Sequence, residues 1–227
     1  MVPNSWRVSS VSLATEDKRE DQNRVCELYG DNLIKNQKNN LRIGFLNIGG
    51  LPLQQDSFKE QELRQGLTAL DFDIFGIAET NIDWRTVPEQ DRLYSRTREW
   101  WESSHLSISS TTATPPVDRR QWGGNAIFSI DKAAHRVIEK GSDPLKLGRW
   151  CWTKYRGKDN QTLRIYCAYC PNPPSGPLSV FSQHRVALLL SNDTRNPRVA
   201  FAQDISQDIK AALENQEKSY PNAGWEQ

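Results

Sequence analysis

The hydrophobic pattern along the chain becomes regular only at residue 41. Residues 1–40 are polar, rich in Asn, Lys, Glu and Asp, and carry no sustained hydrophobic period, so we expect a poorly ordered leader there. Glycines at 49 and 50 and a proline at 52 predict a turn. Between leader and turn, residues 41–47 predict a strand with one face formed by Leu41, Ile43, Phe45 and Asn47.

A helix and a buried strand follow this turn. Ser57 and Glu60 have capping-box spacing, and the leucines at 63, 67 and 70 recur at helical intervals. The apolar run over residues 72–78 predicts a buried strand that ends at Glu79. Strand, helix and strand within so short a stretch indicate an α/β protein.

The second half of the chain predicts a hairpin and two helices. Residues 103–117 are rich in Ser, Thr and Pro, which is typical of a surface loop. We therefore expect a single α/β domain over residues 41–227. Its later strands and helices are predicted at 150–155, 163–169, 180–190 and 201–213.

Composition excludes several classes of protein. The 227 residues contain 29 Lys and Arg and 28 Asp and Glu, giving a net charge of +1, and 9% are aromatic, which argues against a disordered chain. No run approaches the ~18 apolar residues of a membrane span, and Met1 to Ser10 lacks the apolar core of a secretory signal. We expect an intracellular protein, nuclear or cytoplasmic, without a membrane partner. Near-neutral charge leaves a local phosphate site open.

The cysteines predict free thiols rather than a metal site. Cys167 and Cys170 have CxxC spacing, which is half of a zinc site or a redox pair, but Cys26 and Cys151 stand alone. A structural zinc site needs a second pair of ligands. Buried strand cysteines in a reducing compartment are therefore the expectation.

Three polar residues stand where predicted strands end, and each is a candidate for chemistry. Glu79 supplies a carboxylate suited to a hard cation such as Mg²⁺ or Mn²⁺, and Asn47 supplies an amide that can orient ligands or donate to phosphate. The hydroxyl of Tyr169 can hydrogen-bond a phosphate oxygen. The alternative remains open that strand ends simply meet water and that the tyrosine is an ordinary strand aromatic.

Five segments carry these residues in order: LRIGFLNIGGLP at 41–52, DFDIFGIAETNIDW at 71–84, GGNAIFS at 123–129, LGRWCWTKYRG at 147–157 and LRIYCAYCPN at 163–172. Together they resemble the endonuclease/exonuclease/phosphatase family, and most closely the endonuclease domains of non-LTR retrotransposons. The resemblance implies a deoxyribonuclease I-like four-layer α/β sandwich, in which two packed mixed β-sheets are flanked by helices. It also implies a nucleic-acid partner, foremost DNA, and derivation from, or fusion to, a reverse-transcriptase polyprotein.

The resemblance also implies roles for individual residues. Glu79 matches the family's metal-binding Glu, Asn47 the Asn that shares that site with a catalytic role, and Tyr169 the catalytic Tyr that faces phosphate. The implied metal is Mg²⁺ or Mn²⁺. Substrate-binding roles are expected for Arg149, Asn81 and Trp84, the last by stacking on splayed bases.

The chain departs from the family after Tyr169. The family's strand ending in Gly-Asp-Phe-Asn, its later Asp and its terminal Ser-Asp-His have no counterpart. We therefore expect a domain incomplete at its C-terminus, inactive alone, with an unpaired sheet edge and an uncovered apolar face. A metal-dependent endonuclease, an inactive remnant or binding module, and a phosphoesterase for a small substrate all remain open, as does the oligomeric state.

Overall fold

The computed structural model describes residues 40–53, 57–112, 121–159, 161–173, 176 and 179–218. Of the expected leader, residues 1–40, only residue 40 is described; Cys26 lies outside the described residues. The elements, in chain order, are β1 (Ile43–Asn47), α1 (Phe58–Ala69), β2 (Ile74–Ala78), η1 (Glu89–Asp91), α2 (Leu93–Trp100), β3 (Ser104–Ser109), β4 (Asn125–Ile130), η2 (Ala134–Arg136), β5 (Val137–Ser142), β6 (Trp150–Arg156), β7 (Thr162–Ala168), α3 (Val180–Leu190) and α4 (Pro197–Lys218).

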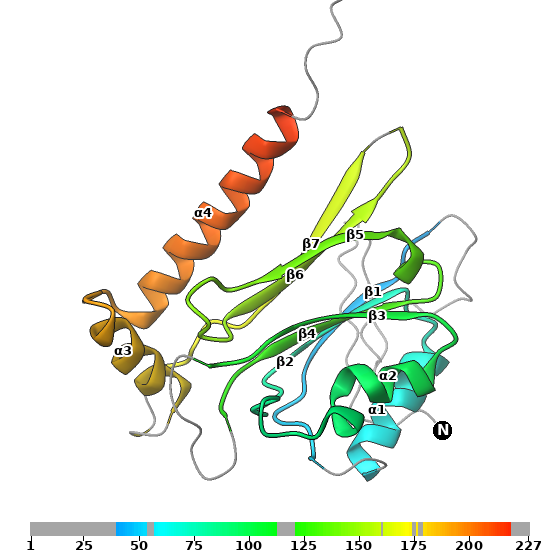
Figure 1. Cartoon of the computed structure of the whole chain (residues 1–227), viewed down its shortest axis with the longest axis horizontal. Helices are drawn as coiled ribbons and strands as arrows, with labels where there is room; N and C mark the ends of the chain where they lie inside the picture. The colour runs from blue at the N-terminus through cyan, green and yellow to red at the C-terminus, as the bar shows by residue number, and fades with distance from the viewer. Residues whose placement is uncertain are drawn as a thin grey trace, which may run out of the picture.

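Two β-sheets pack face to face, and helices lie outside both (Figure 1). The first sheet has the order β1-β2-β4-β3; its β1–β2 pair is parallel and its other pairs are antiparallel. The second sheet has the order β5-β6-β7 and is antiparallel throughout its described strands, whereas a mixed sheet was expected. The four-layer α/β sandwich expected from the sequence is confirmed.

The layers are held by two apolar clusters. Leu63 and Leu67 of α1 pack with Phe75 of β2 and Phe128 of β4, so the helix covers the outer face of the first sheet. Between the sheets lies a second cluster, formed by Ile74, Ile127, Ala133, Cys151, Tyr155 and Cys167. Because alternate residues of β2 point to opposite faces, its five residues are buried on both sides.

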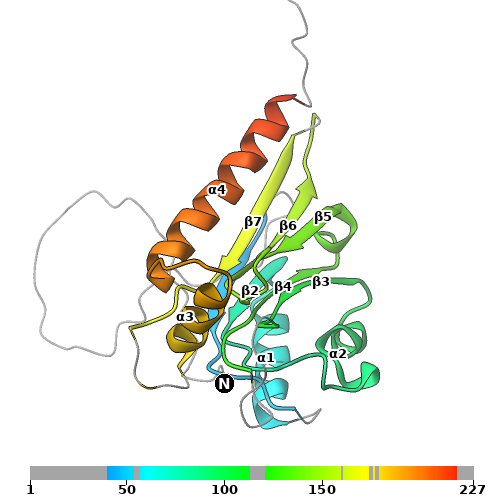
Figure 2. The same ribbon diagram turned by 60° about the vertical axis from the view of Figure 1, so that its left-hand side comes forward.

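Helix α4 covers the outer face of the second sheet (Figure 2). Phe201 packs edge-to-face on Trp150 of β6, with ring centroids 6.1 Å apart. Asp208 accepts hydrogen bonds from the indole N–H of Trp150 at 3.0 Å and from the hydroxyl of Tyr166 at 3.2 Å. Polar contacts therefore anchor much of this helix. None of the helices in the described part of the chain combines the length and apolarity that crossing a bilayer requires.

The segment expected as a surface loop at 103–117 contains strand β3, which corrects that prediction. Two of its serines, Ser107 and Ser109, are buried, and the Ser107 hydroxyl lies 2.6 Å from that of Thr153 on β6. Hydroxyl groups that bond to each other across the two sheets can be buried without loss of a partner. Composition alone could not show this pairing.

One side of the sandwich, at the edge strand β1, exposes apolar side chains among the described residues. A side-chain carbon placed on Gly76 would lie 3.2 Å from both Phe45 of β1 and Cys167 of β7, so these strands lie on the same side of β2. Each is a terminal strand of its sheet among the described residues. Ile43 and Phe45 are consequently 49% and 54% exposed.

Candidate functional site

The parallel pairing of β1 and β2 brings Asn47 and Glu79 to the same edge of the first sheet. Asn47 is the register partner of Ala78, the residue before Glu79. The chain leaving β1 stays bonded to this edge, because the Gly50 N–H donates to the Glu79 carbonyl at 2.6 Å. Asn47 is exposed, and its side-chain oxygen accepts a hydrogen bond from the Gly49 N–H at 3.0 Å.

Tyr169 reaches this edge from the second sheet. Cys167 of β7 packs against β2, with its thiol 3.3 Å from the Ile77 carbonyl oxygen, and the Tyr169 N–H donates to the Arg149 carbonyl at 2.8 Å. The Glu79 carboxylate lies close enough to the Tyr169 hydroxyl to raise the pKa of the phenol. Two of the three strand-end candidates thus come together across the sheets, and the third lies on the neighbouring strand.

Burial and a nearby carboxylate both shift the pKa of the tyrosine. Burial raises the pKa of Tyr169 well above its usual value, and its interaction with the Glu79 carboxylate raises the pKa further. The phenol is protonated at neutral pH, as an ordinary tyrosine is, and the raised pKa extends this state to more alkaline pH. Its oxygen accepts a hydrogen bond from the Asn172 amide at 3.4 Å.

The oxygen atoms at this edge suit a hard divalent cation. Glu79 is half-buried and offers carboxylate oxygens, and Asn47 offers an amide oxygen beside it. Mg²⁺ is commonly held by one or two carboxylates while it retains several waters, so this donor set fits such an ion. No group of three or more His, Cys, Asp or Glu able to hold a metal occurs among the described residues.

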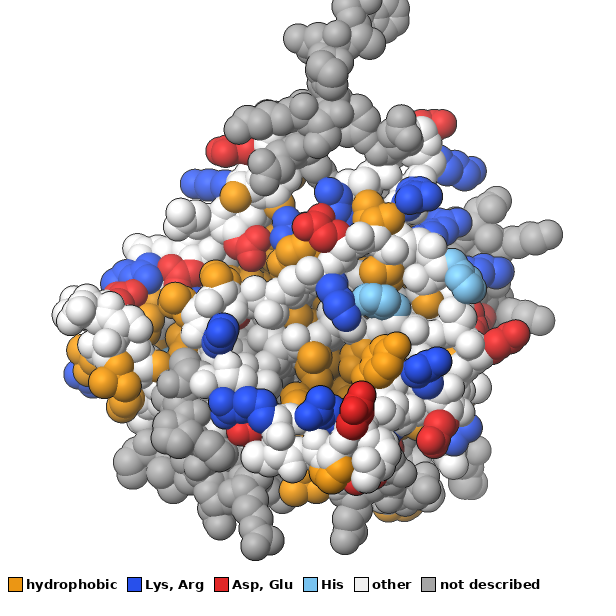
Figure 3. Space-filling view, viewed as in Figure 1, with side chains coloured by type: hydrophobic (Ala, Val, Ile, Leu, Met, Phe, Trp, Pro, Cys, Tyr) orange, Lys and Arg blue, Asp and Glu red, His pale blue; other side chains and the backbone are white. Residues whose placement is uncertain are grey.

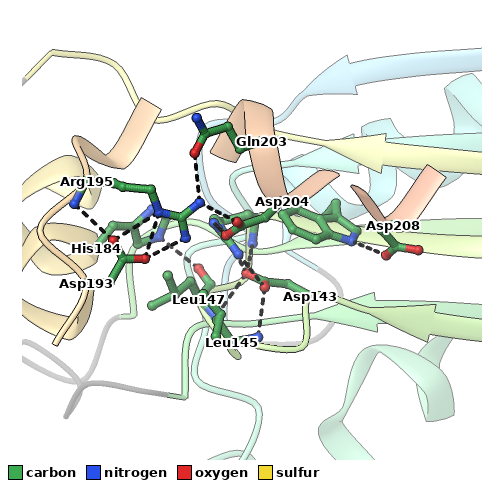
Figure 4. A network of polar contacts seen from close by, with 11 residues as sticks. Asp143, Leu145, Leu147, His184, Asp193, Arg195, Gln203, Asp204 and Asp208 are labelled. Atoms are coloured by element: carbon green, nitrogen blue, oxygen red, sulfur yellow. Dashed lines mark hydrogen bonds and ion pairs between the residues drawn. The ribbon is translucent and has the colours of Figure 1, made fainter. Parts of the chain in front are cut away.

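Arg149 does not face this edge, although the sequence suggested a substrate contact. Its guanidinium is 1% exposed and donates to both oxygens of Asp143, at 2.7 and 2.8 Å, and to Asp204 of α4 at 2.8 Å. Asp204 also accepts from Arg195 at 2.8 Å (Figure 4). The observed contacts therefore join α4 to the sheet, and they engage this buried cation with two carboxylates.

The other two expected substrate contacts are also buried. Trp84 is 8% exposed and belongs to the core cluster beneath the first sheet, which leaves no free ring face for a base. Its indole N–H has no hydrogen-bond partner among the described residues. Asn81 is 6% exposed, and its side-chain oxygen accepts from the Gly123 N–H at 2.8 Å. Both geometries favour structural roles.

Sequence reasoning missed the groups that support the site. Gly123 and Gly124 bond to the turn after Glu79, and Lys59 of α1 donates to the Gly50 carbonyl at 2.6 Å. The Gly-Gly pair was a visible signal, because consecutive glycines mark close backbone approach. Lys59 gave no such signal, since nothing in a helical pattern shows which loop an exposed lysine will reach.

Comparisons with known proteins add a weak structural likeness. No family model matches the chain, and no curated protein matches it. An AP endonuclease from Archaeoglobus fulgidus is similar at 19% identity and a TM-score of 0.38, over 58% of this chain and 41% of that one.

Two further solved structures are endonuclease/exonuclease/phosphatase proteins. The one from Beutenbergia cavernae has 12% identity and a TM-score of 0.38, over 65% of this chain and 43% of that one. The one from Leptotrichia buccalis has 11% identity and a TM-score of 0.40, over 69% and 64%. The chain thus spans between 41% and 64% of the length of these three solved structures, and likeness at this level assigns no function.

Proposed function

We propose that this chain contributes the metal-binding edge of a Mg²⁺- or Mn²⁺-dependent phosphodiester hydrolase of the endonuclease/exonuclease/phosphatase family. The observation that carries the proposal is that Glu79 after β2 and Tyr169 after β7 come together across the two sheets, at the edge where β1 ends in Asn47. A carboxylate and a neutral phenol at the ends of rigid strands form a site for a cation and a phosphate. The retrotransposon-endonuclease type, and origin in a reverse-transcriptase polyprotein, rest on the sequence motifs alone.

Each residue has a distinct task in this proposal. Glu79 and Asn47 would hold the divalent ion, and such an ion neutralises charge on a phosphodiester. Tyr169, a neutral phenol at physiological pH, can donate its hydroxyl to a phosphate oxygen. On the face shown in Figure 3, basic and acidic side chains are interspersed, in keeping with the net charge of +1. We therefore propose a local contact with DNA at this edge rather than a broad basic surface.

The test is nicking of supercoiled plasmid with Mg²⁺, by this chain and by any longer polypeptide read from its gene. We expect the longer polypeptide to nick and this chain alone to remain near background. Glu79→Gln should lower nicking ~100-fold or more, because even groups that only support a ligand change metal affinity by 10–100-fold. The matched control is Glu99→Gln, an exposed carboxylate on α2. Equal nicking by both variants would sink the assignment.

A second candidate is a nucleic-acid-binding module without hydrolysis. It is favoured by the described surroundings of Tyr169, which supply one carboxylate and no histidine able to act on water. His184 is 2% exposed and its Nε2 bonds the Leu147 carbonyl at 2.8 Å. Mg²⁺-dependent retention of a DNA duplex by the longer polypeptide, without nicking, would support this candidate over hydrolysis.

A further inference from the structure

The chain after Glu79 has an unusual backbone. Glu79 and Asn81 have φ angles of +57° and +54°, in the left-handed region that residues with a side chain rarely adopt. Asn is among the few residues that tolerate it, because its short amide can bond locally. Two left-handed residues so close together need support from outside the turn.

That support comes from Asn81 and the two glycines before β4. The Asn81 N–H donates to the Gly123 carbonyl at 2.8 Å, and the Asn81 side-chain oxygen accepts from the Gly123 N–H, also at 2.8 Å. Thr80 is fully buried, and its N–H donates to the Gly124 carbonyl at 3.2 Å. A side-chain carbon on Gly124 would lie 2.6 Å from the Thr80 hydroxyl oxygen, so this close approach needs glycine.

The opposite side of the turn is held by the segment after β1. The Gly50 N–H donates to the Glu79 carbonyl at 2.6 Å, and the Leu51 N–H donates to the Thr80 carbonyl at 2.8 Å. The backbone of Glu79 is therefore fixed between two loops, while its side chain is free to reach Tyr169. Two side chains of the turn bond Gly123: the Thr80 hydroxyl donates to its carbonyl at 3.5 Å, and the Asn81 amide oxygen is the acceptor for its N–H.

We infer that Asn81 is a positioning residue, which sets the direction of the Glu79 carboxylate toward Tyr169 through the Gly123 clamp. Its own side chain is buried and does not touch substrate. Without the Asn81 oxygen the Gly123 N–H loses its acceptor, the turn relaxes and the carboxylate leaves the phenol. The consequence for metal binding rests on the proposed function, whereas the geometric claim does not.

The test compares two substitutions that both tolerate a left-handed backbone. Asn81→Asp keeps a side-chain oxygen for the Gly123 N–H, and Asn81→Gly removes it. The probe is the ¹³Cζ resonance of Tyr169 in tyrosine-labelled chain, assigned with Tyr169→Phe, because it reports how closely the Glu79 carboxylate approaches the phenol. Asn196→Ala is the control, since it also removes one side-chain bond to a backbone N–H, at the start of α4.

We expect Asn81→Gly to shift the Tyr169 resonance in the direction that Glu79→Gln does, and Asn81→Asp and the control to leave it in place. Circular dichroism melts establish that each variant is folded. An unshifted resonance in folded Asn81→Gly, or in Glu79→Gln, would overturn the inference. If Asn81→Gly unfolds, it is replaced by Asn81→Ser, whose shorter side chain still carries an acceptor oxygen and should give an intermediate shift. An unshifted Tyr169 resonance in Asn81→Ser would equally overturn the inference.

Binding of Mn²⁺, measured by electron paramagnetic resonance, separates this inference from the proposed function. Asn81→Gly should weaken Mn²⁺ binding ~10-fold, the lower end of the effect of groups that orient a ligand. If the unaltered chain binds no Mn²⁺, the proposed function fails, and the Tyr169 resonance still decides the positioning role. If Mn²⁺ binding is lost in Glu79→Gln but unchanged in Asn81→Gly, the function stands and the inference fails.

Discussion

Replacement of Arg149 by Met tests whether the buried ion pairs hold the second sheet to α4. The change keeps an unbranched apolar stem and removes the charge. It leaves Asp143, whose side chain is 0% exposed, without the cation that bonds both of its oxygens. It also frees Asp204, which is 16% exposed and keeps its contact with Arg195. The two carboxylates should therefore contribute unequally to the loss of stability.

The expected loss in free energy of unfolding is about 3–5 kcal/mol. Removal of one partner of a buried pair costs this much because the remaining charge is uncompensated. Asp143 still accepts from the Leu145 and Leu147 N–H groups at 3.0 and 3.2 Å, which places the expectation toward the lower end. For a domain of this size, 3–5 kcal/mol corresponds to about 6–20 °C in Tm.

Urea unfolding at pH 7, followed by circular dichroism and tryptophan fluorescence, measures the effect. The matched control is Arg156→Met, an exposed arginine at the end of β6, the strand that begins directly after Arg149; for it we expect a change within about 0.5 kcal/mol. A loss below ~1 kcal/mol for Arg149→Met would refute the structural assignment. Weaker DNA binding by an Arg149→Met chain of unchanged stability would also refute it, and would indicate that the arginine contacts the substrate.

Two further predictions concern buried titratable groups. Burial lowers the pKa of His184 to about 4 in the folded chain, against 6.5 when unfolded. As the pH drops, the unfolded chain therefore binds the proton first. The free energy of unfolding should fall between about pH 6.5 and pH 4, by about 3 kcal/mol at most. Urea midpoints across this range should show a smaller fall in His184→Gln, and an equal fall would contradict the assignment. Burial raises the pKa of Cys151, so in a Cys26→Ser chain a thiol reagent should label Cys170 rapidly, with Cys151 and Cys167 reacting only on unfolding; mass spectrometry of the labelled peptides decides.

Much of the fold could be predicted because its signals are local. The apolar run before Glu79, the capping pair Ser57 and Glu60, and the turn between the strands of the hairpin each act within a few residues, and the structure has β2, α1, β6 and β7 there. Strand β3 escaped prediction because Ser107 owes its burial to Thr153, forty-six positions away. Such a partner leaves no mark on the composition of its own segment.

The candidate site shows the same division. Asn47, Glu79 and Tyr169 could be chosen from the sequence because each stands at a strand end. Their convergence depends on the packing of β7 on β2, which no local pattern reveals. Arg149 was misread because its partner Asp204 is fifty-five positions away on a helix, and a long-range ion pair of this kind has no sequence spacing to recognise.

The exposed edge strand β1 has a consequence for hydrogen exchange at the site. Glu79 follows a central strand whose residues are all buried, whereas Asn47 ends an edge strand with Ile43 and Phe45 about half exposed. Amide protons of an edge exchange through small local openings, while those of a central strand exchange only through larger ones. The two residues of the proposed cation site therefore belong to regions of unequal protection. A cation bound to both residues would couple the edge strand to the central strand, and the amide protons of β1 would then exchange more slowly.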